Sequence, residues 1–237
     1  MEQKHKVYNL IILDESGSMQ SIKKTIINGF NEVVQTIKTV AVQYPEQEHS
    51  VTFISFNSID LKKIVENSSI ESLNEIDERS YTPNGGTPLF DAMGSSFFNL
   101  ECIIAKDNPK NYNVLVTILT DGEENASKEH TLQSIKAKIE ELTLKNWTFT
   151  YIGANHDVHD FASRISISNV MKFETSEEDI QRMFMRDRDA RMNYSRKIRN
   201  YEDVSNGYFT RTETDEDLPF PEEKKQERKS FWKKLFG

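Results

Sequence analysis

Two short apolar segments, each followed by an aspartate, constrain the fold of this 237-residue chain more than any other feature. Residues 7–13 lead directly into Asp14, and residues 114–119 are followed by Thr120 and Asp121. A nearly continuous apolar run of this length is typical of a strand that is covered on both faces, as the strands of parallel sheets are. We therefore predict that both segments lie inside a sheet with helices on its two sides.

Strand and helix patterns alternate along the rest of the chain. Apolar residues recur every three or four positions from Met19 to Tyr44, which predicts a long amphipathic helix that ends before Pro45. A second strand is predicted at residues 51–56, and a shorter, more polar strand at 60–65 suits the edge of a sheet. The later elements are a helix capped by Thr87 with Pro88 as its first residue, helices at about 128–142 and 158–165, and strands at 147–152 and near 170–173. This alternation predicts an α/β fold.

The C-terminal part of the chain has a different composition. Residues 176–185 predict a further helix, with acids in its first turn and an apolar stripe. The stripe fades after Met185, and residues 186–191 are charged on every face, so this helix is expected to end there or to project into solvent. From about residue 202 an acidic stretch is followed by a basic and aromatic end. We therefore predict one domain over residues 1–200 and a tail without its own core over residues 201–237.

Charge and cysteine content narrow the class of function. The chain has 38 acidic against 30 basic residues and a formal net charge of -8 that is spread along its length, which disfavours a general nucleic-acid binder. Its one cysteine, Cys102, cannot form an internal disulfide and lacks the companions of a zinc site. The apolar residues before Asp14 are too few for a signal peptide, and no stretch approaches the ~20 apolar residues of a membrane helix. We therefore expect a cytoplasmic protein.

Hard oxygen groups occur at three junctions of the predicted elements. Asp14, Ser16 and Ser18 come from the turn after the first strand, Thr87 from a Gly-Gly turn, and Asp121 from the turn after the later apolar strand. The carboxyl ends of parallel strands meet at one edge of a sheet, where α/β proteins bind their ligands. Five small oxygen groups that carry only two charges suit Mg²⁺ or Mn²⁺ better than Ca²⁺. The sequence therefore predicts a divalent-cation site made by these five residues.

Such a site would leave room for a ligand from outside the chain. Mg²⁺ and Mn²⁺ favour six oxygen ligands, so five side-chain groups leave at least one position open. An Asp or Glu of a partner protein could take that position, because a carboxylate is a stronger donor than water. Each feature alone has a plainer explanation, since serine and threonine often cap helices and Asp-Gly often forms a turn. Their occurrence together, each at a strand or helix junction, favours the metal site.

The five predicted ligands also form a known pattern. Asp14-Glu15-Ser16-Gly17-Ser18 matches a DxSxS motif, Thr87 an isolated threonine, and Asp121 the aspartate of a TDG motif. Together they resemble the metal-ion-dependent adhesion site of von Willebrand factor A domains. Residues 85–92 and 151–155 also resemble the cytoplasmic bacterial branch related to the tellurium-resistance TerY-like proteins.

This resemblance has consequences for both fold and function. It implies a three-layer α/β sandwich around a six-stranded sheet of order 3-2-1-4-5-6, which is mostly parallel and has one antiparallel edge strand. It also implies a protein-binding module that holds Mg²⁺ or Mn²⁺ and is not an enzyme. Fold does not by itself imply function, so the second expectation depends on the site residues.

An enzyme of the haloacid dehalogenase type is the alternative. Such a phosphotransferase also places an aspartate nucleophile and Mg²⁺ ligands at strand ends, and Asp14, Thr87 and Asp121 could be assigned to those positions. Ser16 stands where an aspartate acid/base is expected, however, and no lysine is evidently placed to hold the phosphoryl group. The binding module is therefore the preferred hypothesis.

The basic, aromatic end at residues 224–237 is the second informative segment. Its large apolar side chains would share one face of a helix, with the lysines off that face: Phe231, Trp232, Leu235 and Phe236. We expect this tail to dock on a partner, and weak binding to a membrane surface or packing against the domain are the alternatives.

Overall fold

Six strands form one sheet, and their order confirms the predicted topology. The computed structural model describes residues 4–154 and 157–210. The sheet runs in the order β3-β2-β1-β4-β5-β6, and neighbouring strands are parallel except for the antiparallel pair of β2 and β3 at one edge. The strands are β1 (His5–Asp14), β2 (Gln47–Phe56), β3 (Leu61–Ser69), β4 (Tyr112–Thr120), β5 (Trp147–Gly153) and β6 (Asn169–Lys172).

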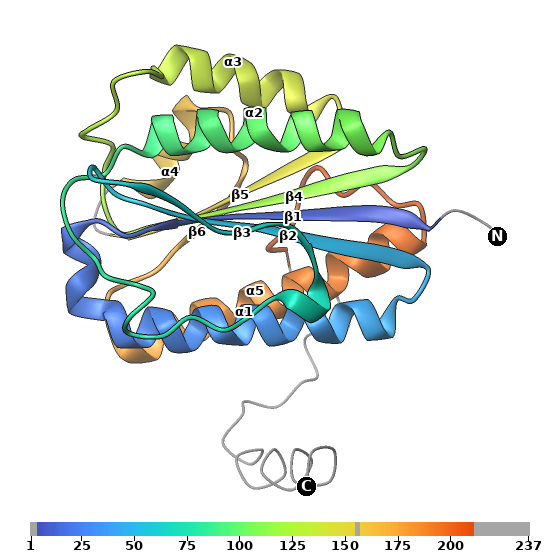
Figure 1. Cartoon of the computed structure of the whole chain (residues 1–237), viewed down its shortest axis with the longest axis horizontal. Coiled ribbons are helices and arrows are strands. Elements are labelled where there is room, and N and C mark those ends of the chain that lie inside the picture. The colour runs from blue at the N-terminus through green and yellow to red at the C-terminus, as the bar shows by residue number, and fades with distance from the viewer. Residues whose placement is uncertain (1–3, 155–156, 211–237) are drawn as a thin grey trace, which may run out of the picture.

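Helices cover both faces of this sheet, which makes three layers (Figure 1). One face carries α1 (Lys23–Gln43), which follows the 3₁₀ turn η1 (Gly17–Ile22), and α5 (Glu177–Arg199). The other face carries α2 (Leu89–Asp107), α3 (Leu132–Thr143) and α4 (Val158–Arg164). A second 3₁₀ turn, η2 (Ile70–Ser72), follows β3.

The central strand β1 shows why its apolar run is continuous. Successive side chains of a strand point to opposite faces of the sheet. Leu10 and Ile12 pack into the core under α2, α3 and α4, whereas Ile11 and Leu13 pack into the core under α1 and α5. All four side chains are buried. The predicted strand with cover on both faces is confirmed.

Several element boundaries differ from the prediction, and the two that bear on the site are those of α2 and β3. α2 begins at Leu89 with Pro88 as its N-cap, so Thr87 lies outside the helix and does not cap it. β3 continues past residue 65 to Ser69, because Asn67 keeps contact with β2 by donating its backbone N–H to Thr52 Oγ1 at 3.0 Å. The left-handed backbone of Asn67, with φ of 41°, lies where the register of the pair shifts.

The prediction that the last helix ends or leaves the domain after Met185 is wrong. α5 continues to Arg199, and Asp187 and Arg191 on it are both buried. Their charges are hidden because they pair, with Arg191 Nε donating to Asp187 Oδ2 at 2.7 Å. Arg191 Nη2 also donates to Thr117 Oγ1 of β4 at 2.7 Å. The prediction failed because Asp and Arg are rarely buried without a partner, and the sequence does not show that these two side chains pair with each other.

The residues after α5 lie against the domain as far as residue 210. Tyr208 is buried, and its backbone N–H donates to Asn169 Oδ1 at 3.0 Å while its hydroxyl donates to Asp187 Oδ1 at 3.2 Å. The division of the chain at residue 200 stays a prediction, and the tail segment at 224–237 lies outside the described residues. Within the described ranges, no helix has both the length and the apolar character needed to cross a membrane.

Candidate metal site

The ends of two adjacent strands bring Asp14 and Asp121 to one place. β1 and β4 are parallel neighbours with Leu13 paired to Leu119, so the residues that follow leave the same edge of the sheet. Both aspartates are buried. Asp14 Oδ2 accepts a hydrogen bond at 2.6 Å from the hydroxyl of Thr120, the residue before Asp121. The structure thus places both carboxylates at the carboxyl ends of the two central strands.

The hydroxyls of Ser16 and Ser18 connect these carboxylates. The Ser16 backbone N–H donates to Asp14 Oδ1 at 2.7 Å, and Ser16 Oγ lies 3.1 Å from Ser18 Oγ. Ser18 Oγ in turn donates to Asp121 Oδ1 at 2.6 Å. A continuous run of polar contacts therefore links the turn after β1 to the turn after β4.

Thr87 reaches the same place from the loop before α2. A Cβ atom on Gly122 would lie 3.7 Å from both Ser18 Oγ and Thr87 Oγ1, so the two hydroxyls face the residue after Asp121 from one side. Asn125 holds Thr87 there, because its Oδ1 accepts from the Thr87 N–H at 2.8 Å and its own N–H donates to the Thr87 carbonyl at 3.1 Å. All five sequence-predicted residues lie together at this edge.

Helix capping does not explain these hydroxyls. Ser16 occupies the N-cap position of η1, but its side chain makes no capping hydrogen bond, and Thr87 precedes the N-cap of α2. By contrast, the side chains of Thr131, Asp157 and Ser176 cap α3, α4 and α5. Because the usual structural use of a serine or threonine at a helix start is missing at Ser16 and Thr87, a ligand role is favoured for both.

The carboxylate of Asp14 is costly to bury as a charge. Burial, together with the charge of Asp121, raises the pKa of Asp14 to about 6, although hydrogen bonds from Thr120 and Ser16 act in the opposite direction. A cation beside such a group stabilises its charged form. The electrostatic state of Asp14 therefore suits a site that receives a positive ion.

The donor set suits a small hard cation. It consists of two carboxylates and three hydroxyls, all of them oxygen donors, and Mg²⁺ and Mn²⁺ prefer such ligands. Among residues 4–154 and 157–210, no three His, Cys, Asp or Glu side chains come together as a metal-binding group. The residues present thus fit Mg²⁺ or Mn²⁺ better than a metal that needs thiolates, imidazoles or several carboxylates.

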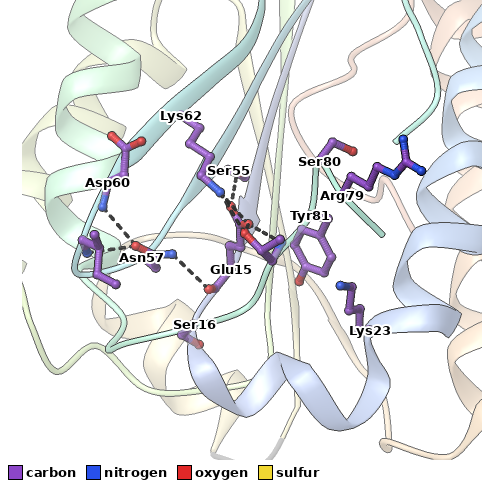
Figure 2. Close-up of polar contacts among 12 residues, drawn as sticks. Glu15, Ser16, Lys23, Ser55, Asn57, Asp60, Lys62, Arg79, Ser80 and Tyr81 are labelled. Atoms are coloured by element: carbon purple, nitrogen blue, oxygen red, sulfur yellow. Dashed lines mark hydrogen bonds and ion pairs between the residues drawn. The ribbon is translucent and has the colours of Figure 1, made fainter. Parts of the chain in front are cut away.

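Glu15, between two of the predicted ligands, is a residue to which the motif assigns no role. Its side chain is fully buried, and Figure 2 shows donors around its carboxylate. Lys62 Nζ of β3 donates to Oε1 at 2.8 Å, and Ser55 Oγ of β2 donates to Oε2 at 2.7 Å. The Thr82 backbone N–H also donates to Oε1. Glu15 therefore joins the turn after β1 to two strands and to the loop that leads to Thr87.

Backbone contacts strengthen this connection between the two loops of the site. The Glu15 carbonyl accepts from the Asn84 N–H at 2.9 Å, and the Gly17 N–H donates to the Gly85 carbonyl at 3.0 Å. Gly85 has φ of 73°, a left-handed conformation that favours glycine. No local signal identifies the role of Glu15, because its side-chain partners are 40 to 67 positions away in the sequence.

Replacing Glu15 by alanine is expected to destabilise the fold by about 2–3 kcal/mol, because Lys62 and the Thr82 N–H lose a buried acceptor. The effect stays moderate since the Lys62 side chain is 32% exposed and water replaces part of what it loses. Urea denaturation should compare Glu15→Ala with Glu66→Ala, which breaks only the exposed pair with Lys63. Equal free energies of unfolding for the two variants would show that the buried contacts of Glu15 do not stabilise the fold.

Two solved structures share this architecture. A von Willebrand factor type A protein from Catenulispora acidiphila matches with 15% identity and a TM-score of 0.50, over 80% of this chain and 43% of that chain. Proximal thread matrix protein 1 from the mussel byssus matches with 15% identity and a TM-score of 0.52, over 77% of this chain and 46% of that chain. The chain thus spans less than half the length of either protein.

These similarities concern the fold alone. No protein-family model matches the chain, and no curated protein matches it. The sheet order and the antiparallel edge strand are those that the resemblance to von Willebrand factor A domains implies. The chain has the fold of a von Willebrand factor A domain.

Proposed function

We propose that this chain is a divalent-cation-dependent protein-binding module. An Asp or Glu of a partner protein would complete the coordination of a Mg²⁺ or Mn²⁺ ion that five side chains hold: Asp14, Ser16, Ser18, Thr87 and Asp121. The observation that carries the proposal is the run of contacts from Asp14 through the two serine hydroxyls to Asp121. This run lies at the edge of the sheet where α/β folds bind their ligands.

The charges of the ligands decide which partner group fits. Asp14 and Asp121 balance the two positive charges of the ion, while the three hydroxyls are neutral. Five side-chain groups leave an octahedral ion at least one position for an outside oxygen. When bound, the ion attracts a carboxylate to that position, and the turns after β1 and β4 determine where on the surface it is held.

Binding fits the state of Asp14 better than catalysis does. A phosphotransferase of the haloacid dehalogenase type would need Asp14 as a nucleophile with an oxygen open to its substrate. Asp14 is fully buried, and Ser16 stands at the position where that mechanism expects an aspartate acid/base. The proposal therefore gives the chain no catalytic role.

We further propose that the chain belongs to the bacterial TerY-like branch and lies in the cytoplasm. Residues 85–92 and 151–155 support membership of the bacterial TerY-like branch. A cytoplasmic location agrees with that branch and with a chain that has a single cysteine. The acidic net charge of -8 supports a protein partner in preference to a nucleic acid.

Mn²⁺ alone is expected to bind weakly, and a carboxylate ligand should tighten it, because each ligand binds better when the other is present. Asp121→Asn should lower the Mn²⁺ affinity by at least about tenfold, and Thr87→Val by less, since only the first change removes a charge. Isothermal titration calorimetry of the full chain and both variants measures these affinities. Equal Mn²⁺ binding by all three proteins would place the ion elsewhere.

Selection of peptides tests the protein-binding role. The full chain is immobilised, and a phage-displayed library of random peptides is selected in Mg²⁺ and, in parallel, in EDTA. We expect Mg²⁺-dependent binders that share an Asp or Glu, and we expect Asp121→Asn to lose them. Asp60→Asn, in an exposed turn at the same edge of the sheet, is the matched control and should keep them. Metal-independent binding, or binders without an acidic residue, would overturn the proposal.

A further inference from the structure

A hollow beside the proposed metal site is lined by residues that are not among the five proposed ligands. Its volume is about 330 Å³, and it lies between the start of α2, the turn after β4, the start of α3, and α4. Phe90, Leu132 and Phe161 form its apolar part, and the rings of Phe90 and Phe161 are stacked at a centroid distance of 6.0 Å. Because Phe90 closely follows Thr87 and Glu123 closely follows Asp121, the hollow adjoins the proposed ligands.

The rim of this hollow is acidic. One guanidinium, that of Arg164, faces four carboxylates: Glu123, Glu124, Asp157 and Asp160. Glu124 and Asp157 already accept hydrogen bonds from backbone N–H groups of their own turns. Glu123 and Asp160 are exposed, so their charges can meet a charge from outside the chain. A pocket with this lining attracts a cation and offers that cation an apolar surface.

We infer that the hollow binds a lysine or arginine side chain of the same protein segment whose carboxylate completes the metal site, an inference that rests on the proposed function. Lysine and arginine combine an apolar stem with a charged head. The rings of Phe90 and Phe161 suit the stem, and the carboxylates of Glu123 and Asp160 suit the head.

The acidic rim also selects against other partners. Asp14 and Asp121 are balanced by the ion, but the carboxylates of the hollow keep their charge and repel a segment that carries acidic residues alone. A basic residue near the metal-binding acid removes this repulsion. The partner is therefore a segment of mixed charge, with one Asp or Glu and a nearby Lys or Arg.

A peptide library with one fixed aspartate tests this pocket separately from the metal site. Selection on the full chain in Mn²⁺ should enrich Lys and Arg within a few residues of the aspartate. The Glu123→Lys/Asp160→Lys double variant should bind an enriched peptide about tenfold more weakly, and high salt should reduce the difference. The Glu48→Lys/Glu202→Lys variant makes the same charge change on exposed residues away from the hollow and should bind the peptide normally.

The possible outcomes separate the two proposals. Mn²⁺-dependent binders that contain the aspartate but prefer only aliphatic or aromatic neighbours would overturn the inference and leave the proposed function standing. Equal binding of an enriched peptide by the two double variants would do the same. Failure to obtain any binder that needs both Mn²⁺ and the aspartate would overturn the proposed function and, with it, this inference.

Discussion

Asp14→Asn is expected to abolish Mn²⁺ binding and yet, in EDTA at neutral pH, to raise the free energy of unfolding by on the order of 1 kcal/mol. Burial and the charge of Asp121 raise the pKa of Asp14 from 3.8 to about 6, so the fold favours the protonated form. The stability contributed by this proton is fully present below the ordinary pKa and is lost as the pH rises through 6. At neutral pH the charged group therefore costs stability, and an amide of similar shape avoids that cost.

The pH dependence separates this effect from an unspecific effect of mutation. In EDTA, the stability difference between Asp14→Asn and the unchanged protein should shrink as the pH falls below 6, because Asp14 becomes protonated. Mg²⁺ should stabilise the unchanged protein but not the variant. Asp60→Asn, with an exposed side chain, should behave like the unchanged protein in both solutions. A variant that still binds Mn²⁺ would contradict the ligand role of Asp14. A variant that is less stable than the unchanged protein at neutral pH in EDTA would contradict the cost assigned to its buried charge.

Arg191→Ala should destabilise the fold by about 3–5 kcal/mol, a large part of the stability of a typical domain. The side chains of Arg191 and Asp187 are only 3% and 1% exposed, and their ion pair attaches α5 to the sheet through Thr117. Among the described residues, removal of the arginine leaves the buried Asp187 carboxylate with one side-chain donor, the Tyr208 hydroxyl at 3.2 Å. An uncompensated buried charge is among the most destabilising changes that one substitution makes.

Two further variants test whether the loss of stability comes from the unpaired buried charge. Asp187→Leu/Arg191→Met removes both charges and should recover most of the loss, because a buried ion pair can be replaced by apolar side chains of similar volume. Arg182→Ala breaks the exposed pair with Asp179 on the same helix and should cost less than about 0.5 kcal/mol. Urea denaturation followed by circular dichroism compares them. If Arg191→Ala costs no more than Arg182→Ala, the buried pair does not hold α5 in place.

Much of this fold can be predicted from the sequence because each strand or helix has its own local pattern of apolar residues. A strand covered on both faces must be apolar throughout, which identifies β1 and β4. The length of α5 has no such signal, because residues 186–191 are charged and their inward face depends on Asp187 and Arg191 pairing with each other. The anchor of that pair, Thr117, is 74 positions from Arg191. Contacts of this kind exist only after the chain has folded.

The same distinction applies to the candidate site. The five proposed ligands come from short motifs at junctions of the chain, and the parallel order of β1 and β4 is enough to bring the turns after them together. Thr87 was expected to cap a helix, but the loop bonded to Glu15 and Asn125 holds it against the other ligands instead. The hollow has no sequence signal, because its lining comes from four separate parts of the chain: α2, the turn after β4, α3 and α4.

Crystals of the full chain grown with Mn²⁺, and measured near the manganese absorption edge, would locate the ion directly. We expect one anomalous difference peak at the carboxyl ends of β1 and β4, roughly 2 Å from side-chain oxygen atoms of the five proposed ligands. Crystals of Asp121→Asn grown in the same way should lack that peak. A peak at another place with none at this edge, or a peak that persists in Asp121→Asn, would contradict the assignment of the cation site.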